Sequence, residues 1–82
     1  MKQILYFTAS WCGPCKLLKP KIQAMQSRFP ITILDVDTNT EACNKYSIRN
    51  VPTIVIVNNG QEVGRLVGNN ITEEAIAESF NR

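Results

Sequence analysis

Two cysteines separated by two residues, Cys12 and Cys15, are the side chains in this sequence best suited to chemistry. Two thiols at this spacing can close a disulfide within one turn of backbone or remain reduced as a dithiol. A thiolate attacks a disulfide sulfur through a mixed disulfide, so such a pair favours thiol–disulfide exchange. Half of a metal site and two inert core cysteines are the alternatives. Zinc takes four ligands, whereas the chain has no histidine and one further cysteine, Cys43.

The surrounding sequence places this pair between a strand and a helix. Residues 4–7 are continuously apolar, which predicts a strand over 2–8 that is buried on both faces. Apolar residues then recur at helical spacing and predict a helix over 12–28: Leu18, Ile22, Met25 and Phe29. Cys12 should therefore lie near a helix N-terminus. Unpaired N–H groups and the positive end of the helix dipole stabilise a thiolate there, lowering a thiol pKa from ~8.5 to about 7.

The rest of the chain supplies the other elements of a small sheet protein. We predict three further strands and two further helices: strands 31–36, 53–57 and 62–67, and helices 40–46 and 72–81. A strand–helix–strand order implies a right-handed crossover between parallel strands. The turn at 58–60, Asn-Asn-Gly, predicts an antiparallel hairpin. The predicted fold class is α/β, with a four-stranded mixed sheet in the order 2-1-3-4, a βαβαββα element order and three flanking helices.

Residues 11–16, Trp-Cys-Gly-Pro-Cys-Lys, resemble the active site of the thioredoxin family. Residues 46–53 are similar to its second active-site segment, and Asn59-Gly60 and Val67-Gly68 match its C-terminal hairpin. The resemblance covers most of the chain. It implies one thioredoxin-like domain over residues 1–82 that lacks the extra N-terminal strand and helix of full-size members.

The resemblance also assigns roles to individual residues. It implies that Cys12 is the nucleophile and that Cys15 resolves the mixed disulfide. It further implies a cis peptide bond between Val51 and Pro52. The implied target-binding residues are Trp11, Gly13, Pro14, Val51, Pro52 and Gly68. Two of these have other interpretations: an aromatic residue before a helix often belongs to a core, and Gly68 could simply end a strand.

Two positions depart from the family pattern. Thioredoxins usually bury an aspartate beneath the resolving cysteine and pair it with a lysine, and these positions are Tyr6 and Ile33 here. Tyrosine, with a pKa of ~10, is a poor base at neutral pH. We therefore expect Cys15 to lose its proton to water or to Cys12, and the second step of exchange to be slow.

Composition limits the partners and the compartment. The net charge of +2 is too small to indicate binding to nucleic acid or to an anionic membrane. Residues 1–30 contain five basic side chains and no acidic one, which fits either a solvated helix face or a positive field that steers acidic partners. No apolar run approaches the ~18 residues of a membrane span, and the short apolar stretch before the motif leads us to expect no signal peptide. We therefore expect a cytoplasmic monomer. Cys43 is then either a small packing residue or a regulatory thiol.

The predicted function is that of a protein-disulfide reductase. The resemblance implies electrons that come ultimately from NADPH through a thioredoxin reductase, with no bound cofactor and no metal. Implied partners are disulfide-containing proteins, for example ribonucleotide reductase or peroxidases. A glutathione-dependent, glutaredoxin-like reductase and a non-enzymatic partner subunit are the alternatives. A disulfide-forming oxidant is disfavoured because the Gly13-Pro14 dipeptide resembles that of reducing members.

Overall fold

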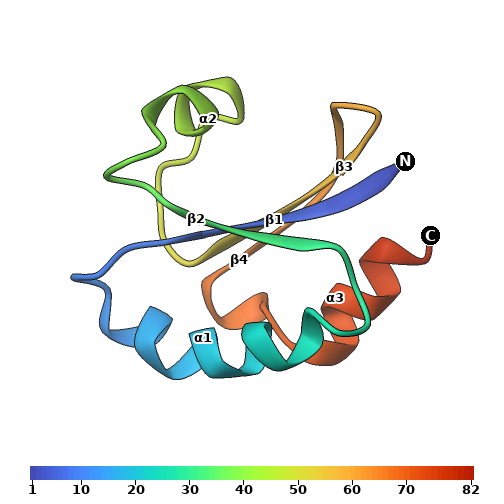
Figure 1. Ribbon diagram of the computed structural model, residues 1–82, viewed down its shortest axis with the longest axis horizontal. Coiled ribbons are helices and arrows are strands. Elements are labelled where there is room, and N and C mark those ends of the chain that lie inside the picture. Colours follow the sequence, from blue (N-terminus) through green and yellow to red (C-terminus); the bar gives the residue numbers. More distant parts are fainter.

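A four-stranded sheet with helices on both faces forms the molecule, and the computed structural model describes all residues 1–82 (Figure 1). The strands are β1 (Lys2–Thr8), β2 (Ile31–Asp35), β3 (Thr53–Asn58) and β4 (Gln61–Val67). The helices are α1 (Gly13–Met25), α2 (Thr40–Lys45) and α3 (Glu73–Phe80), and a 3₁₀ helix covers Gly68–Asn70. The sheet order is β2-β1-β3-β4, as the sequence predicts.

Strand β1 lies in the interior of the sheet. It pairs in parallel with β2 and antiparallel with β3, and β3 pairs antiparallel with β4. The β3–β4 register shifts between Ile56 and Val57, so that Gly64 faces Ile56 and Glu62 faces Val57. A bulge of this kind bends and twists an edge strand. The last two strands therefore form a twisted hairpin at one edge of the sheet.

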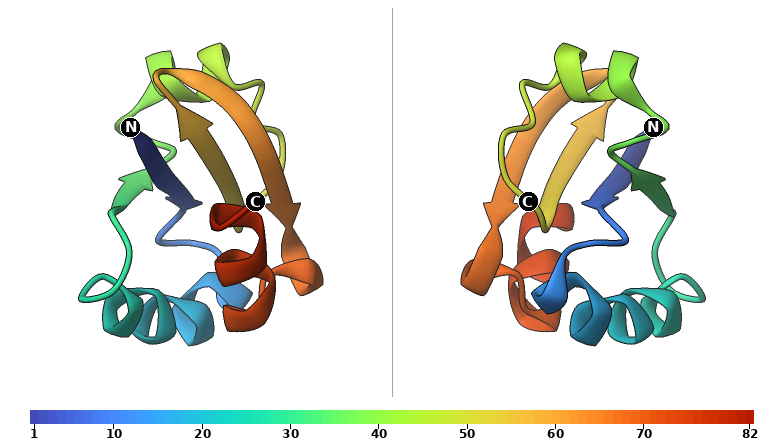
Figure 2. Two further views of the ribbon diagram at one scale, coloured as in Figure 1. Left: turned by 90° about the vertical axis from the view of Figure 1, so that its right-hand side faces the viewer. Right: turned by 90° about the vertical axis from the view of Figure 1, so that its left-hand side faces the viewer.

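The helices divide the core into two layers (Figures 1 and 2). Helices α1 and α3 cover one face of the sheet, and α2 covers the other. Successive strand residues point to opposite faces, so β1 and β3 supply both layers. Under α1 and α3 the fully buried side chains are Ile4, Tyr6, Ile22, Ile54, Ile56 and Ile76. Under α2 the buried side chains are Phe7, Val55 and Val57.

One predicted element is wrong in its extent. The first helix ends at Met25 and not at residue 28. The N–H groups of Arg28 and Phe29 both donate to the Met25 carbonyl oxygen at 2.9 Å, which closes the chain into a turn. Phe29 then packs edge-on against Phe80, with ring centroids 5.4 Å apart. Its helical spacing in the sequence was therefore coincidental, because Phe29 reaches the core from a turn.

Candidate functional site

The cysteine pair lies at the N-terminus of α1, where the sequence places it. Cys12 is the N-cap residue, with extended backbone angles, and Gly13 and Pro14 are the first helical residues. Proline costs little there, because its missing N–H would have no helical partner. Cys12 and Cys15 are joined by a disulfide, with Cα atoms 5.3 Å apart. The Cys15 N–H donates to Cys12 Sγ at 3.2 Å, so a helix amide is aimed at this sulfur.

The loop before β3 lies against the disulfide. The Val51–Pro52 peptide bond is cis, as the resemblance implies. Val51 packs against the cluster of Ala9, Cys12 and Cys15, and its carbonyl oxygen lies 3.8 Å from Cys12 Sγ. The Gly68 N–H donates to the Pro52 carbonyl oxygen at 3.0 Å. The end of β4 is thereby joined to the same loop, and the fold brings Gly68 close to Pro52.

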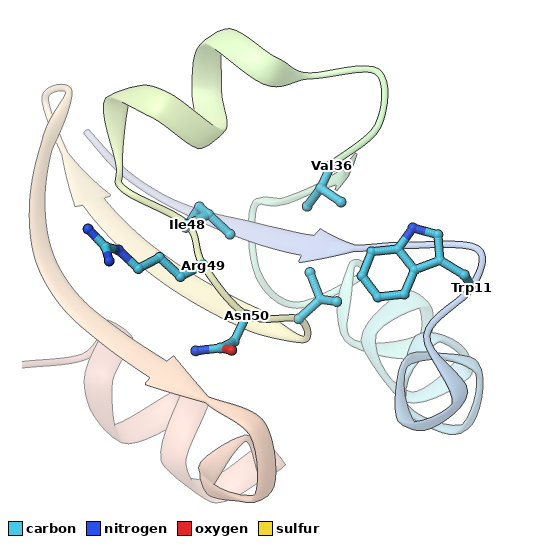
Figure 3. Close-up of a pocket in the computed structure, with 6 residues that line it drawn as sticks. Trp11, Val36, Ile48, Arg49 and Asn50 are labelled. Atoms are coloured by element: carbon cyan, nitrogen blue, oxygen red, sulfur yellow. The ribbon is translucent and has the colours of Figure 1, made fainter.

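Trp11 forms one wall of a pocket beside the disulfide (Figure 3). Its side chain is 66% exposed, so the interpretation as a core residue is wrong. The indole Nε1–H donates to Asp37 Oδ2 at 3.1 Å, which fixes the ring. The pocket has a volume of about 290 Å³ and is lined by Trp11, Val36, Ile48, Arg49, Asn50 and Val51. Four of its residues were missing from the expected site, because they come from the end of β2 and from the loop before β3.

A second pocket lies on the other side of the cis proline. Its volume is about 220 Å³, and its lining includes Pro14, Lys21, Pro52, Gly68 and Asn69. Val51 borders the first pocket and Pro52 the second. The six expected target-binding residues are therefore distributed around two adjoining pockets and the disulfide between them.

The two positions that depart from the family pattern lie next to each other. Tyr6 on β1 is paired in register with Ile33 on β2. The Tyr6 hydroxyl is buried without a hydrogen-bond partner. Burial raises the pKa of Tyr6, and the nearby Thr8 side chain offsets part of this rise. Tyr6 is therefore no proton acceptor for the resolving cysteine at neutral pH.

A small hollow of about 70 Å³ borders Cys15, which is itself 1% exposed. Its lining residues are Thr8, Ala9, Ser10, Cys15, Lys16, Lys19 and Asp35. A hollow of this size with polar walls has room for water, because one water molecule needs a cavity of only about 10–15 Å³ by the same measure of volume. Water that enters this hollow would reach Cys15, as the expected loss of its proton to solvent requires.

Cys43 on α2 is half-buried and lies in the layer of Phe7. Its thiol lies 3.9 Å from the Val36 carbonyl oxygen, a weak hydrogen bond. Burial, and secondarily the negative charge of Asp37, raise the pKa of the Cys43 thiol. Its packing agrees with the prediction of a small half-buried residue.

Comparison with known proteins decides the family. The thioredoxin family profile matches residues 1–82. The chain belongs to the thioredoxin family. It is 40% identical over 68 residues to a thioredoxin of Chlamydia trachomatis, an alignment that covers 79% of this chain and 67% of that protein. A thioredoxin H-type of Fagopyrum esculentum is 38% identical over 68 residues, covering 79% of this chain and 59% of that relative.

Solved thioredoxins share the fold over nearly the whole chain. The thioredoxin of Fasciola hepatica superposes with a TM-score of 0.85 at 35% identity, covering 98% of this chain and 78% of that one. The thioredoxin 1 of Thermosipho africanus gives a TM-score of 0.79 at 26% identity and is covered over 90% of its length. The alignments thus span about half to two thirds of the curated relatives that they match and most of the solved structures. Members of this family are dithiol–disulfide oxidoreductases. The Cys12–Cys15 disulfide is the group in this chain that is suited to thiol–disulfide exchange.

Two further observations bear on the expected properties. None of the helices combines the length and the apolar composition that crossing a bilayer requires. No group of three or more histidine, cysteine, aspartate or glutamate side chains comes together as metal ligands.

Proposed function

We propose that this chain reduces disulfides of other proteins, with Cys12 as the nucleophile and Cys15 as the resolving thiol. The observation that carries the proposal is the disulfide at the N-terminus of α1, with the Cys15 amide directed at Cys12 Sγ. A helix N-terminus favours the thiolate over the thiol. Cys12 is also the more accessible cysteine, at 5% exposed against 1% for Cys15.

The reaction proceeds by two exchanges. The Cys12 thiolate attacks one sulfur of the target disulfide, a Cys12–target disulfide forms, and the other target sulfur leaves as a thiolate that takes up a proton. Cys15 then loses its proton and attacks Cys12 Sγ. This step releases the second target thiol and leaves the Cys12–Cys15 disulfide. Two electrons pass to the target, and the chain must be reduced again before the next cycle.

The target segment lies across the cis-proline loop in this proposal. The Val51 carbonyl oxygen is 3.8 Å from Cys12 Sγ, so a peptide whose cysteine reacts there passes beside the Val51 backbone. An extended peptide can add to such a backbone as a short strand. The residues beside this path form the proposed target-binding set: Trp11, Gly13, Pro14, Val51, Pro52 and Gly68.

Membership of the family supports a proposal for the physiological setting. We propose a cytoplasmic monomer that a thioredoxin reductase recharges with electrons from NADPH, without a cofactor bound to the chain itself. Ribonucleotide reductase and peroxidases are the target classes that the resemblance suggests. The half-buried, unpaired Cys43 supports a reducing compartment, where free thiols persist.

Turnover of insulin disulfides tests the proposal. One cuvette contains NADPH and thioredoxin reductase, and the other contains NADPH, glutathione and glutathione reductase. We expect NADPH consumption in the first cuvette and its loss in the Cys12→Ser variant. Consumption only in the second would establish a glutathione-dependent reductase instead. No turnover in either would contradict the proposed recharging route.

A further inference from the structure

The basic side chains of this chain fall into two groups. Three of the nine form ion pairs: Arg28–Glu73, Arg65–Glu62 and Arg82–Glu78. The Lys2 ammonium donates to carbonyl oxygens at the C-terminus, and the Lys45 ammonium lies 5.4 Å from the centre of the Tyr46 ring. Four make no ion pair, hydrogen bond or ring contact: Lys16, Lys19, Lys21 and Arg49.

Each of these four free cations borders one of the three hollows described above. Arg49 borders the pocket of Trp11 and Val51. Lys21 borders the pocket on the other side of the cis proline. Lys16 and Lys19 line the hollow beside Cys15. Three of these cations lie on α1 and the fourth lies in the loop before β3, so two separate segments of the chain bring unpaired cations to the rims of these three hollows.

The nearby carboxylates offset only part of this charge. Asp35 borders the hollow of Lys16 and Lys19 but lies beyond ion-pair distance of both. Asp37 accepts the hydrogen bond from Trp11. Both carboxylates belong to the end of β2 and the turn after it. No carboxylate lines the Arg49 pocket or the Lys21 pocket, so a target crossing the cis-proline loop meets an uncompensated cation on each side.

We propose that this surface selects target segments that carry acidic side chains on both sides of the reacting cysteine, an inference that rests on the proposed reductase function. Apolar side chains line the Trp11 end of the first pocket, and the Arg49 guanidinium points away from the indole (Figure 3). In this proposal, an apolar side chain of the target enters the pocket, and an acidic residue next to it in the target faces Arg49. On the other side of the target's reacting cysteine, a second acidic residue of the target faces Lys21.

The expected effect is on the rate of encounter. Exposed charge pairs contribute little affinity individually, but a cluster of one sign raises the association rate of oppositely charged partners. Salt screens this attraction, since the Debye length falls from about 30 Å at 0.01 M to about 3 Å at 1 M ionic strength. The preference for acidic targets should therefore be largest at low salt and nearly vanish at high salt.

Three synthetic peptide disulfides provide the test. They share one sequence except that glutamate, glutamine or lysine flanks the cysteine on both sides. The chain is reduced with dithiothreitol, freed of the reagent and mixed with each peptide, and the second-order rate constant for peptide reduction is measured by acid quenching and chromatography. We expect the glutamate peptide to react about tenfold faster than the lysine peptide at low ionic strength, with the ratio approaching one in high salt.

Two charge-matched variants locate the effect. Arg49→Gln should lower the ratio of the glutamate to the glutamine rate about threefold. Lys45→Gln removes the same charge at a site that borders none of the three hollows, and it should leave this ratio unchanged. Equal rates for all three peptides, or equal effects of the two variants, would overturn the inference while leaving the reductase function intact. Reduction of none of the peptides would overturn both.

Discussion

Tyr6 stands where the sequence resemblance implies an aspartate. It occupies a buried position in β1, and its hydroxyl has no partner. Tyr6→Asp introduces the carboxylate that the resemblance implies for this position. We expect this change to speed resolution of the mixed disulfide by about tenfold at pH 7, because a positioned base assists proton loss from Cys15. Stopped-flow measurement of target release from a preformed Cys12 mixed disulfide gives the rate.

Tyr6→Phe is the matched control for this prediction. It removes only a hydroxyl that makes no hydrogen bond. The resolution rate should not change, and the free energy of unfolding should rise by about 1 kcal/mol, since an unsatisfied buried polar group is costly. Urea unfolding measures the second effect. An unchanged resolution rate in Tyr6→Asp would show that solvent already suffices as the proton acceptor.

Cys43 yields a prediction about pH. Its thiol pKa is raised by burial and by the charge of Asp37, and only the thiolate reacts with alkylating reagents. Below this raised pKa the Cys43 thiol is protonated and should be labelled slowly. Labelling should become faster as the pH rises through the pKa. In the Cys12→Ser, Cys15→Ser variant, iodoacetamide should modify Cys43 slowly at pH 7 and faster with each increase up to pH 10. Rapid labelling at pH 7, measured by mass spectrometry, would point to a reactive regulatory thiol.

At the scale of single elements, α3 depends on its N-cap. The Thr72 hydroxyl accepts a hydrogen bond from the Ala75 N–H at 3.0 Å, satisfying one of the free donors of the first turn. Thr72→Ala should lower the free energy of unfolding by about 1 kcal/mol. Ser79→Ala in the same helix is the control and should cost nothing, because alanine has the higher helix propensity. Thermal unfolding followed by circular dichroism compares the two, and equal losses would exclude a capping role.

The strands and helices were predictable from local patterns, and the errors have local causes. Strand β1 is signalled by its apolar run, and the β3–β4 turn by Asn59 and Gly60, both of which have positive φ. The end of α1 was misplaced because Phe29 repeats the helical spacing from a turn. The 3₁₀ helix at Gly68–Asn70 carries no comparable signal in the sequence.

The site was predictable only where it is local in sequence. Cys12 and Cys15 lie within one motif, so their placement needed only a strand before them and a helix after them. The Trp11 pocket requires the end of β2 and the loop before β3 to meet the start of α1. Val36 and Arg49 could not be assigned to it from spacing alone, since only the folded sheet brings these segments together.

At the scale of the whole molecule, we propose that residues 1–82 form one cooperative domain. The radius of gyration is 11.5 Å, close to the value of about 12 Å expected for a compact chain of this length. The two core layers share β1 and β3, so neither can lose its packing without disturbing the strands that carry the other. Unfolding of one layer should therefore unfold both.

Substitutions on opposite faces of the sheet test this coupling. Ile22→Ala, on the inner face of α1, and Val55→Ala, on β3 beneath α2, each remove a fully buried side chain. Ile22→Ala should cost about 2–5 kcal/mol. A chain of this size has roughly 4–12 kcal/mol of stability, so either change should shift the entire urea transition. Far-ultraviolet circular dichroism and Trp11 fluorescence should report the same midpoint in each variant, while Leu17→Ala on the exposed face of α1 should leave it unchanged. If the two probes gave separate midpoints in either core variant, the two layers would unfold independently. The shared strands β1 and β3 would then not couple them.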